Sequence, residues 1–224
     1  MELEDTPHLE QGARRSEAGV SYRIWAPRVS RIELEISEGK KVMRRIGLAK
    51  DAAGFHAGRD EEGRPGDLYK YRLDGRDSFP DPASCWQPFG VHGPSMVVDA
   101  RAYRWESAPF ERPPFRDLVI YELHVGAFTP AGTFRGAIER IPYLRALGVS
   151  AIELMPVADF PGERNWGYDG VSLYAPAHSY GHPDDLRALV DAAHAQGPGL
   201  DLVCNGGTER ERGNPAAAFA WRSD

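Results

Sequence analysis

The stretch that decides the fold runs from Leu118 to Pro176 and contains two short apolar runs. Residues 118–125 read Leu-Val-Ile-Tyr-Glu-Leu-His-Val, and residues 151–157 read Ala-Ile-Glu-Leu-Met-Pro-Val. A helix-length crossover between two such runs predicts a βαβ unit, and therefore a parallel sheet. Polar and aromatic residues follow each run, at the strand ends where β/α barrels and open α/β sheets place their ligands.

Local signals define the elements around these two strands. Thr133 is suited to cap a helix, and Pro142 predicts a break or a second short helix starting there. Gly148 is suited to a left-handed cap at the end of that helix. A helix beginning at Pro183 should bury the stripe Leu186, Leu189, Val190 and Ala193, and residues 200–204 form a third short strand. Residues 157–181 between them are expected to be a long loop.

The first half of the chain has a different periodicity. Apolar and polar residues alternate over 20–25, 31–36, 42–48 and 68–73, with turn signals between these segments. Short strands at this spacing predict a β-sandwich at about 19–106, after a flexible lead-in over 1–18. The Pro-rich and Gly-rich segment 80–95 is expected to be an ordered loop. Residues 107–116 read as a linker, 117–205 as a second, α/β domain, and 206–224 as an irregular tail.

Composition narrows the class of protein. The chain has 224 residues, 42% of them apolar, and a formal net charge of −6. It shows no basic stripe for nucleic acid, no secretory signal and no apolar run of membrane-spanning length, so those partners and destinations are disfavoured. Cys85 and Cys204 lie far apart without metal-ligand spacing. This pattern favours free thiols in the cytoplasm, and we expect neither a metal nor another cofactor.

Candidate site residues gather after the predicted strands. Those at strand ends are His124, Thr129, Glu153, Asp159, Asp201 and Asn205, and the loop adds Trp166, Tyr168, Asp169 and His178. Carboxylates and aromatic faces are what a sugar site needs, because hydroxyls donate to acids and pyranose rings stack on aromatic rings. Each residue also has a structural interpretation. The glutamates can pair with neighbouring cations, the histidines can be hydrogen-bonded in the core, and the loop residues can simply form a turn.

Three segments carry a family resemblance. Residues 121–129 (Tyr-Glu-Leu-His-Val-Gly-Ala-Phe-Thr), 151–157 and 165–170 (Asn-Trp-Gly-Tyr-Asp-Gly) resemble the opening of the catalytic barrel of the α-amylase superfamily, glycoside hydrolase family 13. The resemblance covers about residues 19–205 and implies a multidomain β plus α/β fold. An immunoglobulin-like, starch-binding-type β-sandwich would precede about three strands of a (β/α)8 TIM barrel. Residues 80–95 and 158–162 resemble, more narrowly, the members that release trehalose from maltooligosyl trehalose.

The resemblance implies an activity and a set of substrate-binding residues. The activity is retaining hydrolysis of the α-1,4-glucosidic bond next to a terminal trehalose unit, with an α-glucan or maltooligosyl trehalose as substrate. Tyr168 and Asp169 match positions that line the subsite of the reacting glucose. Trp166, in the same motif, is also expected to bind the substrate. Asp201 and Asn205 match the family's first conserved block. That block continues with a histidine in the family, whereas this chain has Gly206, so one sugar-binding donor is missing.

No residue of this chain matches the family's catalytic aspartates and glutamate. Those acids come from strands four, five and seven, and fewer residues follow Leu118 than the roughly 250 of a complete barrel. We therefore expect a truncated family member, inactive by itself, with a frameshift near residues 196–206 as one origin. The alternatives are a branching or debranching enzyme fragment, a split enzyme completed by a second, C-terminal polypeptide, and a non-catalytic glucan-binding module. In the last of these, Tyr69, Trp86 or Trp105 would stack on the sugar.

Overall fold

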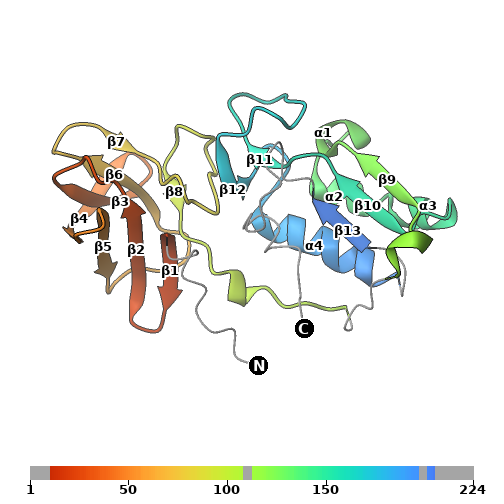
Figure 1. The fold of residues 1–224 in the computed structure, drawn as a ribbon, viewed down its shortest axis with the longest axis horizontal. Coiled ribbons are helices and arrows are strands. Elements are labelled where there is room, and N and C mark those ends of the chain that lie inside the picture. Colours follow the sequence, from red (N-terminus) through yellow and green to blue (C-terminus); the bar gives the residue numbers. More distant parts are fainter. Residues whose placement is uncertain (1–10, 108–112, 197–200, 205–224) are drawn as a thin grey trace. The chain divides into compact units, whose positions relative to one another are not determined.

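The computed structural model describes residues 11–107, 113–196 and 201–204, and the chain divides into two compact units between Ala100 and Arg101 (Figure 1). We call these the first and the second unit. The expected boundary at residue 106 lies a few residues too late. The reason is that Asp191, deep in the second unit, accepts hydrogen bonds from the backbone N–H groups of Glu106 and Ser107, at 2.8 Å each. Trp105 also packs against the second unit's core.

The first unit is built on one antiparallel sheet of eight strands, in the order β1-β2-β5-β4-β3-β6-β7, with β8 also paired to β6 (Figure 1). The strands are β1 (Gly12–Ser16), β2 (Gly19–Trp25), β3 (Ile32–Glu38), β4 (Lys41–Lys50), β5 (Phe55–Asp60), β6 (Leu68–Leu73), β7 (Ser78–Phe79) and β8 (Ser95–Met96). A single-turn 3-10 helix, η2 (Ala100–Ala102), follows at the division.

This sheet is curled rather than flat. β4 pairs with β3 along its length but with β5 only at Ala49 and Lys50, so it joins two halves of the sheet. Alternate residues of β2, β3 and β6, together with Leu48 of β4 and with Val97, form one buried cluster. Its members are Val20, Tyr22, Ile24, Ile32, Leu34, Ile36, Leu48, Tyr69, Tyr71 and Val97. Period-two alternation therefore predicted the buried face correctly. The prediction of a flexible lead-in over residues 1–18 was wrong for residues 12–16, which pair with β2 as strand β1.

The second unit contains the predicted parallel sheet, in the order β13-β10-β9. A 3-10 turn, η3 (Phe115–Asp117), leads into β9 (Ile120–Leu123), α1 (Val125–Phe128), α2 (Phe134–Ile138) and α3 (Ile141–Ala146). They are followed by β10 (Ala151–Leu154), β11 (Ala158–Asp159), β12 (Ser172–Pro176), α4 (Pro183–His194) and β13 (Asp201–Cys204). β10 pairs in parallel with both β9 and β13, so the βαβ prediction is confirmed.

The helix signals of the second unit act as predicted. The Thr133 hydroxyl accepts a hydrogen bond from the Gly136 N–H at 3.1 Å and caps α2. α3 is a separate helix with Pro142 in its first turn, and Gly148 follows it with φ of +90°. α4 begins at Pro183 and buries its predicted stripe against α2 and the sheet.

The segment between β10 and α4 is more ordered than the sequence predicted. Instead of one long loop over 157–181, it contains a two-stranded antiparallel ribbon in which β11 pairs with β12. The ribbon closes the base of a loop formed by residues 160–171, and Phe160 is fully buried beside it. Two-residue strands such as β11 are set by their tertiary partner, because so short a segment carries no periodicity of its own.

Candidate functional site

The candidate site is built where β9 and β10 end. His124 follows β9 directly, and its Nε2 lies 2.5 Å from the backbone carbonyl oxygen of Asn165 and 3.3 Å from the Tyr180 hydroxyl. A carbonyl oxygen can only accept, so Nε2 carries the hydrogen and donates it to Asn165. The histidine thus ties the end of β9 to a loop 41 positions further along the chain.

The loop 165–169 is shaped by its own first residue. The Asn165 Oδ1 accepts a hydrogen bond from the Gly167 N–H at 2.5 Å. Gly167 has φ of +102°, and a Cβ added there would lie 2.8 Å from the carbonyl oxygen of Pro156, two residues after the end of β10. Only glycine fits both the left-handed backbone and this close approach. The loop is therefore held against both strand ends.

This anchoring leaves the three predicted loop residues at the surface. Trp166 is 80% exposed and Tyr168 is 54% exposed, and Asp169 is also exposed. Large aromatic side chains usually bury most of their surface, so two exposed ones on a fixed loop are informative. Together they present flat apolar faces beside a carboxylate, which is the combination that a sugar ring can stack on and donate hydrogen bonds to.

Side chains packed around His124 and Asp159 support the loop. Tyr180 packs edge-on against His124, Phe134 and Phe160, each with 5.9 Å between ring centroids. Burial raises the pKa of the Tyr180 hydroxyl above its ordinary value, so this group stays protonated. The buried Asp159 carboxylate accepts hydrogen bonds from the backbone N–H and from Nδ1 of His178, at 3.1 Å and 2.7 Å. Asp159 and His178 therefore act within the packed layer.

The remaining predicted residues do not join the loop. The Thr129 hydroxyl accepts from the Gly132 N–H at 3.3 Å, which is a local turn contact. Glu153 is half-buried within β10, in register with Glu122 of β9. Asp201 opens β13 in register with Ala151, at the start of that strand. Asn205 and Gly206 lie outside the described residues.

Two residues of this site were not predicted from the sequence. Asn165 shapes the loop and accepts from His124, and Tyr180 buttresses the histidine. Asn165 carried a usable signal, because an asparagine two residues before a glycine often bonds the backbone ahead of it. Tyr180 carried none, because its partners come from segments far away in sequence.

Tyr69 and Trp86, two of the three aromatic residues predicted to stack on sugar in a glucan-binding module, are wrong as stacking residues. Tyr69 is 1% exposed and Trp86 is 7% exposed, so neither presents a face to a ligand. The Tyr69 hydroxyl donates to the buried Asp81 carboxylate at 2.8 Å. Trp105 packs against the core of the second unit. All three residues are used for packing.

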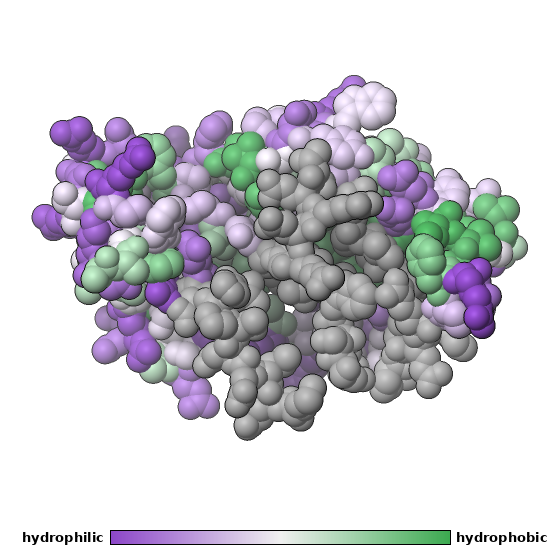
Figure 2. All heavy atoms as spheres, in the orientation of Figure 1, coloured by the Kyte–Doolittle hydropathy of each residue, from purple (hydrophilic) through white to green (hydrophobic). Residues whose placement is uncertain are grey.

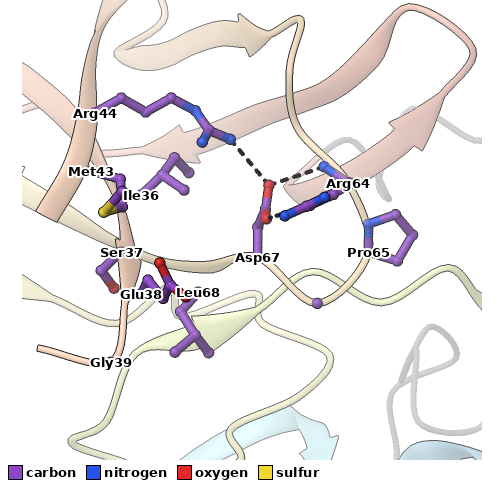
Figure 3. Close-up of a pocket in the computed structure, with 11 residues that line it drawn as sticks. Ile36, Ser37, Glu38, Gly39, Met43, Arg44, Arg64, Pro65, Asp67 and Leu68 are labelled. Atoms are coloured by element: carbon purple, nitrogen blue, oxygen red, sulfur yellow. Dashed lines mark hydrogen bonds and ion pairs between the residues drawn. The ribbon is translucent and has the colours of Figure 1, made fainter. Parts of the chain in front are cut away.

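The first unit has a pocket of its own, of about 580 Å³, next to the β3–β4 hairpin (Figure 3). Figure 3 shows Arg44 and Arg64 both directed at Asp67 on its far wall. Arg44 Nη2 is 3.1 Å from Asp67 Oδ2, and Arg44 also pairs with Asp60. Because its cations are already neutralised and its apolar wall includes no aromatic ring among the lining residues, this pocket has no feature that selects a sugar.

Metal and membrane features were also sought over residues 11–107, 113–196 and 201–204. Within these ranges, no three His, Cys, Asp or Glu side chains converge as a cation site would require. Nor does any helix in the described part of the chain reach the length and apolarity needed to cross a bilayer.

Comparisons with known proteins show which family this chain resembles. The family model described as Alpha amylase, catalytic domain, matches residues 84–212. Malto-oligosyltrehalose trehalohydrolase of Saccharolobus solfataricus is 45% identical over 197 residues, covering 87% of this chain and 34% of that protein. The protein of the same name from Deinococcus radiodurans is 44% identical over 190 residues, covering 84% of this chain and 30% of that protein.

A solved structure agrees with these relatives. The crystal structure of a putative alpha amylase from Salmonella typhimurium has a TM-score of 0.80 and 42% identity, and the match covers 86% of this chain and 32% of that one. The resemblance to glycoside hydrolase family 13, and more narrowly to malto-oligosyltrehalose trehalohydrolases, is thus confirmed. The chain spans about a third of the length of these relatives. Since the matched model covers more than half of the sequence and includes the anchored aromatic loop, the chain belongs to the alpha-amylase catalytic-domain family.

Proposed function

We propose that this chain supplies part of the substrate-binding edge of a glycoside hydrolase that releases trehalose from maltooligosyl trehalose. The observation that carries the proposal is the anchored loop, which exposes Trp166, Tyr168 and Asp169 at the ends of two parallel strands. Such strand ends are where barrel enzymes bind their substrates. The similarity to named trehalohydrolases supplies the substrate class.

The roles within the proposed site follow from side-chain chemistry. Tyr168 and Trp166 stack on glucose rings, and Asp169 accepts hydrogen bonds from sugar hydroxyls. Hydrolysis of a glycosidic bond needs two carboxyl groups at a defined separation, and no residue of this chain is assigned either of these roles. We therefore expect this chain to bind the glucan without cleaving it. We also place it in the cytoplasm, on the basis of its two widely spaced cysteines.

The first unit is not expected to bind the substrate itself. Its curled antiparallel sheet around one buried cluster is what an immunoglobulin-like module would present. The glucan-binding role proposed for it loses its sequence basis, because Tyr69 and Trp86 are buried. We infer that Tyr69 and Trp86 stabilise this unit's own fold rather than forming an independent sugar site.

The proposal is tested by titrating the full chain with maltooligosyl trehalose and with a linear maltooligosaccharide of equal length. We expect the fluorescence of Trp166 to change with both sugars, and Tyr168→Ala to weaken binding by about tenfold, as removing one stacked aromatic ring does. Tyr143→Ala is the matched control, since Tyr143 is equally exposed on α3.

Two outcomes would contradict this function. Equal losses in Tyr168→Ala and Tyr143→Ala would mean that the loop is not the sugar site. A clear preference for a branched glucan over both linear sugars would favour a branching or debranching enzyme instead. Trehalose release by the purified chain would overturn the expectation that it only binds.

A further inference from the structure

Asp159 is a fully buried acid at the foot of the loop 160–171, in the ribbon of β11 and β12 (Figure 1). Its oxygen Oδ1 accepts both hydrogen bonds from His178, and Oδ2 has no partner among the residues that the structure describes. Burial removes the hydration of a carboxylate, and this loss is offset by the donors that the carboxylate contacts. Within the described ranges, His178 alone donates to this side chain.

The backbone of Asp159 closes the loop at its base. The Asp159 carbonyl oxygen accepts a hydrogen bond from the Val171 N–H at 2.8 Å, and Asp159 pairs with Ser172 in the ribbon. Both ends of the loop are thus held at one residue. The side chain of that residue joins the base to a third segment, the turn 177–180 that precedes α4.

The turn 177–180 in its turn contacts the middle of the loop. Tyr180 follows His178 by two residues, and its hydroxyl lies 3.3 Å from Nε2 of His124. The same nitrogen donates to the Asn165 carbonyl oxygen. The base of the loop and its middle are therefore joined by a continuous series of contacts. The sugar-binding residues of the proposed function follow Asn165 directly.

Backbone hydrogen bonds attach the turn at both of its ends. The Ala177 N–H donates to the Val157 carbonyl oxygen at 2.7 Å, and the Tyr180 carbonyl oxygen accepts from the Phe134 N–H at 2.9 Å. These bonds do not involve the Asp159 side chain, so the turn should stay in the fold when that side chain is removed. The carboxylate adds a fixed position for the middle of the turn.

We propose that Asp159 is a positioning residue, which orders the loop 160–171 through His178 and so holds Trp166 and Tyr168 in place for a glucan. The 2.7 Å bond to Nδ1 lies in the range of charge-assisted hydrogen bonds, which are stronger than those between neutral groups. A binding loop that is already ordered loses less freedom on binding, which improves affinity. The order of the loop follows from contacts within the chain, whereas the gain in glucan affinity rests on the proposed function.

The test measures the order of the loop without sugar. The readout is the ¹H–¹⁵N nuclear Overhauser effect of the Trp166 indole N–H in the full chain, assigned with Trp166→Phe. Trp25 is the internal reference, because its indole N–H donates to the Ala53 carbonyl oxygen at 3.1 Å in the first unit. We expect Asp159→Ala to lower the effect for Trp166 and not for Trp25. His178→Ala keeps the backbone donor and should cause a smaller loss, and it carries the comparison if Asp159→Ala does not fold.

Two matched variants separate positioning from a general loss of stability. Asp159→Asn keeps an oxygen that can accept both hydrogen bonds from His178, so it should retain the order of Trp166. Asp191→Ala removes two backbone hydrogen bonds from another part of the same unit. It should destabilise the second unit without changing the Trp166 signal.

Glucan titration is the second step, with maltooligosyl trehalose as the probe. Asp159→Ala should bind about fivefold more weakly than the unmodified chain, and Asp159→Asn about equally. If the unmodified chain binds no glucan, the proposed function fails, and the Trp166 signal still decides the role of Asp159. An unchanged Trp166 signal in Asp159→Ala, or an equal loss of signal in either Asp159→Asn or Asp191→Ala, would overturn the proposal.

Discussion

Replacing Asp81 with asparagine should remove the pH dependence that this carboxyl gives to the first unit's stability. The Asp81 carboxyl is fully buried, and it accepts hydrogen bonds from the Tyr69 hydroxyl at 2.8 Å, the Tyr71 hydroxyl at 3.3 Å and the Ala83 N–H at 2.8 Å. Burial raises its pKa from 3.8 to about 6, and these hydrogen bonds only partly oppose that effect.

The size of the effect follows from the two pKa values. A pKa that rises from 3.8 to about 6 on folding corresponds to about 3 kcal/mol, at 1.36 kcal/mol for each pH unit. Because the folded pKa is the higher one, the stabilisation is fully present below pH 3.8 and is lost as the pH rises through about 6. An asparagine at this position cannot ionise, and its amide oxygen can still accept a hydrogen bond, as the carboxylate oxygens do.

The assay is urea unfolding of the full chain and of Asp81→Asn at several pH values between 4 and 7.5. The near-ultraviolet circular dichroism of tyrosine reports on the first unit, because Tyr22, Tyr69 and Tyr71 pack edge to face there, 5.0 Å and 5.9 Å apart. We expect the variant to gain about 2–3 kcal/mol relative to the unmodified chain across this range. Taking the difference between the two proteins cancels the contributions of all other carboxylates.

Two results would refute this reasoning. One is a stability difference between the two proteins that stays constant from pH 4 to pH 7.5. The other is an Asp81 carboxyl that titrates near pH 4 in a ¹³C NMR experiment, since burial would then have no effect on its ionisation.

Three further predictions concern the second unit. His124→Phe removes the hydrogen bond to the Asn165 carbonyl and should weaken glucan binding several-fold. Because the loop then moves more freely, the indole resonances of Trp166 should become narrower, while the circular dichroism stays unchanged. Unchanged line widths would contradict the anchoring role of His124. Asp191→Ala removes the acceptor of two backbone N–H groups at 2.8 Å. It should cost about 2–3 kcal/mol at pH 7 in urea unfolding. Burial raises the pKa of Asp191, but hydrogen bonds outweigh burial and hold the pKa below its ordinary value of 3.8. The stability lost in the variant should therefore shrink as the pH falls below about 4. A loss of stability that does not depend on pH would contradict this. Ile120→Lys places a charge on β9, an edge of the described parallel sheet over which Figure 2 shows hydrophobic side chains. We expect this edge to make the unmodified chain self-associate and the lysine to lower that self-association in sedimentation velocity; equal sedimentation of both proteins would count against this.

Local chemistry made much of the second unit predictable from the sequence. Thr133, Pro142 and Gly148 each act through backbone groups within a few positions of themselves, so their effects are visible without a structure. The two apolar runs likewise became β9 and β10, although only β10 is buried along most of its length. Family motifs then identified the loop 165–170, whose exposed aromatics the structure displays.

Long-range contacts decided the rest. Nothing adjacent to Tyr69 or Trp86 in the sequence distinguishes a stacking aromatic from a buried one; the distinction depends on Asp81 and the curled sheet. The ribbon of β11 and β12 exists only because each supplies the other's hydrogen bonds. The contact between Asp159 and His178 joins residues 19 positions apart in the sequence.

The sequence by itself therefore predicted the alternating buried face of the first unit, the parallel strands and helix signals of the second, and the family, because periodicity, capping and motifs are properties of neighbouring residues. Only the tertiary structure decided which side chains are exposed and how His124 holds the loop at Asn165. The physical reason is that burial and electrostatics depend on distances between segments, and the chain fixes those distances only when it folds.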